Sequence, residues 1–131
     1  MKQFVIINKA INLNNFQIMQ YVYDVIHLFV NKQLLQDKPM ILGNNEHYVY
    51  NVVLSHAQQE WLKEKTIELM YVNDEKEMMK YMDLSCELGM NIEYRLHHNE
   101  LNESYMAICA IGPCKEENIE YLKKEFNKYF E

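Results

Sequence analysis

The sequence contains little glycine, proline, cysteine or arginine, and it has no long apolar run. Glycine and proline together account for five of the 131 residues, so neither a low-complexity tract nor a long linker is expected. No segment approaches the about eighteen consecutive apolar residues of a membrane span. With 49% hydrophobic residues, the length suits one compact domain that covers residues 1–131.

The three cysteines predict reduced thiols rather than a disulfide framework. Cys86, Cys109 and Cys114 form neither an even disulfide set nor a pair with metal-ligand spacing. Two of them lie in apolar surroundings, where a small buried thiol is the ordinary interpretation. We therefore expect a soluble, cytoplasmic protein with no cofactor.

Positive charge is scarce, and the acidic residues gather in the second half of the chain. The net charge is -6, and Arg95 is the single arginine. Residues 1–72 carry six basic and six acidic side chains, whereas residues 73–131 carry seven basic and thirteen acidic ones. Proteins that bind nucleic acids neutralise phosphates with lysine and arginine, so non-specific RNA binding is disfavoured. An acidic face suits a basic protein partner, or it simply keeps the protein soluble.

Hydrophobic periodicity predicts alternating strands and helices. Continuous apolar runs and alternating patterns indicate strands, and apolar residues at steps of three and four indicate helices. The expected order is a strand at residues 4–7, a helix at 16–35, a strand at 65–72, a helix at 74–88, strands at 91–96 and 105–111, and a closing amphipathic helix after a Gly-Pro stop. This order predicts an α/β fold: a three-layer α/β/α sandwich with a mixed, mainly four-stranded sheet.

The first helix is apolar over much of its circumference. One face carries Phe16, Met19, Tyr23, Ile26 and Val30, and the neighbouring face is also apolar. Such a helix either lies between other elements or meets a second subunit. We therefore expect a homodimer through this helix.

Residues 36–60 leave two alternatives open. A Gly43-Asn-Asn45 stretch favours a hairpin, whereas residues 50–62 also suit a second helix. Periodicity does not decide between them over so short an apolar stretch.

Several segments together resemble the archaeal and eukaryotic type of peptidyl-tRNA hydrolase, the peptidyl-tRNA hydrolase 2 family. The segments that carry the resemblance are residues 2–7, Trp61 with residues 66–72, residues 73–89, and the Ala-Ile-Gly-Pro stretch at 110–113 before an acidic helix start. Residues 36–60 are a divergent or inserted segment. The resemblance implies cleavage of the ester that joins a peptide to its tRNA.

The family's catalytic residues are absent from the matching positions. The family uses a lysine in a Lys-Gly-Lys-x-Ala-Ala-Gln-x-x-His motif, and on this chain Gln17 takes the place of that lysine and Asp24 the place of the histidine. The family's aspartate and threonine lie in a loop that here begins with His97 and His98. Because glutamine brings no positive charge to stabilise an oxyanion, we expect the standard activity to be lost, unless Lys9 or Lys32 projects into the cleft.

Two functional hypotheses follow. In the first, a related enzyme acts on a tRNA ester with a site rebuilt from Gln17, Asp24, His97 and His98. In the second, the chain is a non-catalytic binding module, of the inhibitor or immunity type, that engages a basic protein partner. Asp24 or His27 with the two loop histidines also has the donor types of a zinc site, but solvated loop histidines are the simpler interpretation and no metal is predicted.

Overall fold

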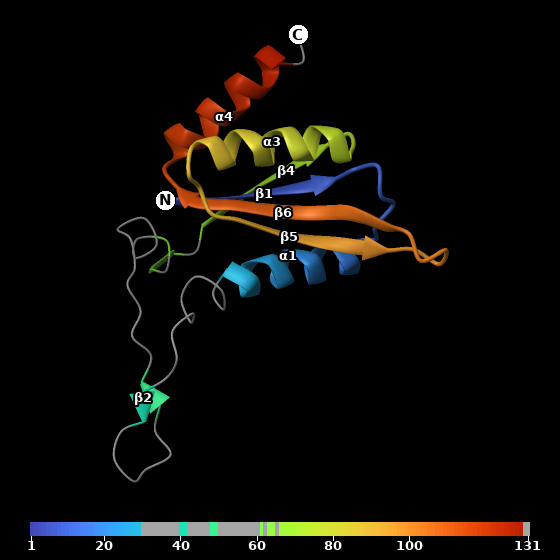
Figure 1. Ribbon diagram of the computed structural model, residues 1–131, viewed down its shortest axis with the longest axis horizontal. Coiled ribbons are helices and arrows are strands. Elements are labelled where there is room, and N and C mark those ends of the chain that lie inside the picture. Colours follow the sequence, from blue (N-terminus) through green and yellow to red (C-terminus); the bar gives the residue numbers. More distant parts are fainter. Residues whose placement is uncertain (30–39, 42–47, 50–60, 62, 65, 130–131) are drawn as a thin grey trace.

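The computed structural model describes residues 1–29, 40–41, 48–49, 61, 63–64 and 66–129. The elements in chain order are β1 (Lys2–Asn8), α1 (Asn15–Phe29), β2 (Met40–Ile41), β3 (Tyr48–Val49), β4 (Ile67–Val72), α3 (Glu75–Glu87), β5 (Ile92–His98), β6 (Ser104–Cys114) and α4 (Glu116–Tyr129) (Figure 1). Within these residues, no helix has both the length and the apolar character that a membrane crossing requires.

The main sheet has four strands in the order β4-β1-β6-β5. β1 runs parallel to β4, and β6 runs antiparallel to both β1 and β5. The parallel pair follows from the order of elements, because a strand that returns after a helical crossover lies parallel to the first one. The α/β class and the mixed four-stranded sheet expected from the sequence are thus confirmed.

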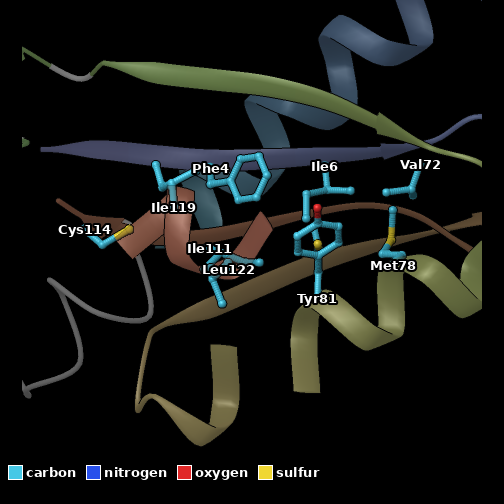
Figure 2. Close-up of a cluster of buried hydrophobic side chains, with 10 residues drawn as sticks. Phe4, Ile6, Val72, Met78, Tyr81, Ile111, Cys114, Ile119 and Leu122 are labelled. Carbon is cyan, nitrogen blue, oxygen red and sulfur yellow. The ribbon is translucent and has the colours of Figure 1, made fainter. Parts of the chain in front are cut away.

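The larger core lies between the sheet and the helices α3 and α4. Phe4 and Ile6 of β1 and Ile111 of β6 meet residues of the two helices that include Met78 and Leu122 (Figure 2). Each fully buried side chain of this size contributes roughly 1.5–3 kcal/mol relative to an exposed one. This face of the sheet therefore holds much of the hydrophobic free energy of the fold.

α1 covers the opposite face of the sheet with a smaller core (Figure 1). Val25 is fully buried there, and Ile18 and Val22 pack beside it against β1 and β6. Of the two apolar faces, the sheet covers the one with Val25, whereas Phe16 and Met19 on the other face are 76% and 71% exposed. Both faces are apolar in the sequence, so periodicity could not tell which one the sheet covers. The helix extends to Phe29, and the predicted continuation to residue 35 lies outside the described residues.

β6 continues past the position where the sequence predicted its end. The Gly-Pro pair was expected to stop the strand after residue 111, but β6 reaches Cys114. Gly112 donates its backbone N–H to the Asn91 carbonyl at 2.9 Å, and Cys114 pairs with Lys2. Gly112 has a φ of 98°, a conformation that glycine adopts without strain. Because β6 is paired with the start of β5 on one side and with β1 on the other, the strand continues past the Gly-Pro pair.

The short strands β2 and β3 pair antiparallel, with Met40 opposite Val49. This pairing supports the hairpin alternative for that part of the chain. The alternative helix at residues 50–62 lies almost entirely outside the described residues.

Candidate functional site

Gln17, the residue that takes the place of the family's lysine, closes the first turn of α1. Its backbone N–H donates to Asn14 Oδ1 at 2.8 Å, and its own side-chain Oε1 accepts from the Asn14 N–H at 3.0 Å. This reciprocal pair is a capping box, which satisfies two donors that a helix start leaves unpaired. Both hydrogen bonds give Gln17 a structural role.

Asp24 and His97 connect α1 to the edge strand β5. Asp24 Oδ2 lies 3.4 Å from Arg95 Nε, and the Tyr21 hydroxyl lies 2.7 Å from His97 Nδ1. Residues three apart on a helix share one face, as do residues two apart on a strand. The two contacts therefore form adjacent rungs that dock the helix on the strand.

His98 is not part of these rungs. Its Nδ1 lies 2.7 Å from the Ser104 hydroxyl of β6, because successive residues of a strand point to opposite faces. The structure thus does not bring Gln17, Asp24, His97 and His98 together in one site. Each makes a separate contact with its own partner.

A hollow of about 500 Å³ opens beside the carboxyl ends of the parallel strands β1 and β4. We call it the β1–β4 hollow. It is lined by Asn8, Ala10, Ile11, Asn12, Asp74, Glu75, His97, Asn99 and Tyr105. The chain leaves β1 toward α1 on one face and leaves β4 toward α3 on the other (Figure 1). This is the place where open α/β sheets bind their ligands.

His97 is the one predicted site residue that lines the β1–β4 hollow. Sequence reasoning missed Asn8 and Asp74, which stand at the ends of the two parallel strands. Asn8 is buried, and its amide donates to the Met106 carbonyl at 2.9 Å while its Oδ1 accepts from the Ala10 N–H. Asp74 caps α3 by accepting from the Glu77 N–H at 2.9 Å. The signal that could have found them was their position directly after each parallel strand.

The lining of the β1–β4 hollow is acidic. It includes the carboxylates of Asp74 and Glu75 and contains no lysine or arginine among the described residues. The Tyr105 hydroxyl donates to Glu103, and this hydrogen bond raises the pKa of the tyrosine. Lys9 is not among the lining residues, and Lys32 lies outside the described part of the chain.

Comparison with known proteins finds no matching family model and no matching curated protein. The site must therefore be interpreted from its own chemistry.

That chemistry includes no metal cluster in the described part of the chain, and the two buried cysteines, Cys109 and Cys114, are not reactive. No group of three or more histidine, cysteine, aspartate and glutamate side chains gathers there as metal ligands would. Burial raises the pKa of Cys109 to about 12 and that of Cys114 to about 11. A nucleophilic thiol needs a lowered pKa, so neither cysteine suits covalent catalysis.

Proposed function

We propose that the chain has a three-layer α/β/α fold like that of the peptidyl-tRNA hydrolase 2 family but lacks the family's activity. In this proposal it is a cytoplasmic binding module that engages a basic protein partner at the β1–β4 hollow. The acidic lining, with Asp74 and Glu75 and no described lysine or arginine, is the observation that carries the proposal.

The charge of the hollow argues against a tRNA substrate. Every nucleotide brings a negative phosphate, and protein contacts to phosphates come from lysine, arginine and other donors. Carboxylates at the mouth of the hollow would repel that backbone, whereas lysine and arginine side chains of a protein would be attracted. The net charge of -6 extends this preference to long range.

The contacts of the matched residues argue in the same direction. Gln17 is occupied by the capping box, and Asp24 by Arg95 and by the Gln20 amide, which donates at 3.2 Å. A catalytic role would require these side chains to reach a substrate instead. The strand order β4-β1-β6-β5 and the Ala-Ile-Gly-Pro stretch at 110–113 before the acidic start of α4 support the proposal that the chain has the family's fold. They do not support the family's activity.

A binding measurement with a lysine-rich peptide of ten residues as the probe tests the proposed function. The variant Asp74→Asn/Glu75→Gln removes two charges with little change of shape, and asparagine is as good a helix cap as aspartate. The loss of these two charges, one exposed and one partly buried, should weaken binding roughly fivefold. Glu87→Gln/Glu117→Gln removes two exposed charges at the other end of the sheet and serves as the matched control. Equal effects of the two double variants would contradict the proposed site.

A second candidate function is a residual ester hydrolase, and the Tyr21–His97 contact favours it. If the tyrosine hydroxyl donates to His97 Nδ1 at 2.7 Å, the other ring nitrogen carries the proton and is a donor, and His97 is one of the residues that line the hollow. A hydrolysis assay on peptidyl-tRNA separates the two functions. Turnover that is lost in His97→Ala but kept in Gln17→Ala and Asp24→Ala would establish the enzyme. No turnover by the unaltered chain would exclude it.

A further inference from the structure

β5 is an edge strand whose outer side is free of any other described strand. The sheet order places β5 at one end, opposite β4 (Figure 1). Proteins usually protect such an edge with lysine or other charged side chains, with proline or with a bulge in the edge strand. The charged residues of β5 are Glu93 and Arg95. β5 contains neither lysine nor proline, and the extra residue where its register with β6 shifts, Ala107, belongs to β6. The edge is therefore regular and able to pair.

The backbone groups that point outward can be assigned from the pairing with β6. Asn91 accepts from the Gly112 N–H, so in the antiparallel ladder Glu93 and Arg95 also direct their N–H and C=O toward β6. The alternate residues Ile92, Tyr94 and Leu96 direct theirs away from it. An incoming strand would thus hydrogen-bond to the even-numbered residues.

We propose that a second copy of this chain occupies this edge, with the two β5 strands antiparallel about a two-fold axis at Tyr94. In this register Tyr94 lies opposite the Tyr94 of the second copy, and the outward N–H and C=O of both residues pair. Ile92 then lies opposite Leu96, again with outward groups on both. The two four-stranded sheets join into one sheet of eight strands.

Charge complementarity selects this register among those that the backbone allows. A two-fold axis at Tyr94 places Glu93 of each copy, which is 5% exposed and has a contact in its own chain, opposite Arg95 of the other, so opposite charges lie across the new strand pair. A two-fold axis at Glu93 or at Arg95 would instead place like charges directly opposite. The register at Leu96 would pair Arg95 with His97, which brings no negative charge.

The side chains on both faces of β5 also suit a second copy of the chain as the partner of this edge. On one face, Tyr94 and Leu96 are exposed apolar residues, and pairing would join them with their symmetry mates into one apolar stripe. On the other face, Arg95 would lie between Asp24 of its own chain, at 3.4 Å, and Glu93 of the second copy. The interface would thus be apolar on one face and ionic on the other.

Sedimentation velocity of the full chain over a range of concentrations measures the association. We expect a dimer, and we expect Tyr94→Lys to weaken it at least about tenfold, because two lysines would lie opposite each other on the axis. Tyr121→Lys is the matched control, since Tyr94 and Tyr121 are 48% and 49% exposed and Tyr121 lies on α4. A monomeric chain, or equal association of both variants, would overturn the proposal. So would a dimer that survives Tyr94→Lys and dissociates in Met19→Lys, which would place the interface on α1.

Oxidative cross-linking tests the register separately. In a background of Cys86→Ser, a cysteine in place of Tyr94 should form a disulfide with its symmetry mate, because directly opposite residues lie about 5.5 Å apart between Cα atoms. A cysteine in place of Leu96 should not, since four residues of offset separate the two copies of that position by about 13 Å. Cross-linking through position 96 in preference to 94 would overturn the proposed axis. This inference does not depend on the proposed binding of a basic partner.

Discussion

Replacement of the buried Gln3 should stabilise the protein. The Gln3 side chain is completely buried in β1, and neither its Nε2 nor its Oε1 has a hydrogen-bond partner among the described residues. A buried amide without partners costs roughly 1–3 kcal/mol. Methionine has nearly the same shape and no strong polar group, and the backbone bond from the Gln3 N–H to the Thr66 carbonyl at 2.9 Å does not involve the side chain.

We therefore expect Gln3→Met to raise the free energy of unfolding by about 1–2 kcal/mol and the melting temperature by roughly 3–6 °C. Urea unfolding followed by circular dichroism measures the change, as a higher midpoint at an unchanged slope. Gln20→Met is the matched control, because Gln20 is exposed on α1 and such a substitution stays within about 0.5 kcal/mol. A loss of stability in Gln3→Met would refute the reasoning, since it would mean that the amide makes favourable bonds in solution.

Three further outcomes can be checked. Gly112→Ala should lower the free energy of unfolding by about 2 kcal/mol or more in the same urea assay, because a Cβ there would lie 2.8 Å from the Cys114 backbone nitrogen at a φ of 98°; an unchanged midpoint would contradict this. Burial raises the pKa of Tyr81 to about 12, so its contribution to stability is fully present below pH of about 10 and is lost as the pH rises toward 12. The free energy of unfolding, measured from pH 9 to 12, should therefore fall less steeply with pH in Tyr81→Phe than in the unaltered chain. Parallel curves would contradict the raised pKa of Tyr81. A thiol reagent should modify the exposed Cys86 in the native state but leave Cys109 and Cys114 unmodified until the chain unfolds, and rapid reaction of all three would show that the larger core opens readily.

The sequence predicts the helices and strands of this fold better than it predicts which face of a helix is buried. The continuous apolar run at residues 4–7 identified a strand buried on both sides, and the structure places Phe4 and Val5 on opposite faces of the sheet, both fully buried. On α1 the same reasoning could not choose a packed face, because two neighbouring faces are apolar and only the position of the sheet decides between Val25 and Met19. That position depends on contacts between α1 and β5, which lie far apart in the sequence.

The candidate site was less predictable for a related reason. Alignment to a motif assigns a chemical role to a position, but it does not say which neighbour the side chain will meet. Gln17 and Asp24 were expected as site residues only from the family resemblance; in the structure Gln17 is half of a capping box, and Asp24 pairs with Arg95. Of the four predicted site residues, only His97 lines the β1–β4 hollow. Most of the residues around it lie at or just after the ends of β1 and β4, and a search for parallel strand ends would have found those residues without any motif.

The polar rungs between α1 and β5 give Asp24 and His97 a structural role. α1 lies over the edge of the sheet, where the side of β5 that meets the helix presents the polar residues Arg95 and His97. Hydrogen bonds and an ion pair must therefore align the helix there, and only polar residues at positions 21 and 24 can supply them. The same polarity that suits a substrate in an active enzyme suits helix docking in this chain, so the presence of Asp24 and His97 is not evidence of catalysis. The contacts of Asp24 with Arg95 and of His97 with Tyr21 indicate helix docking rather than catalysis.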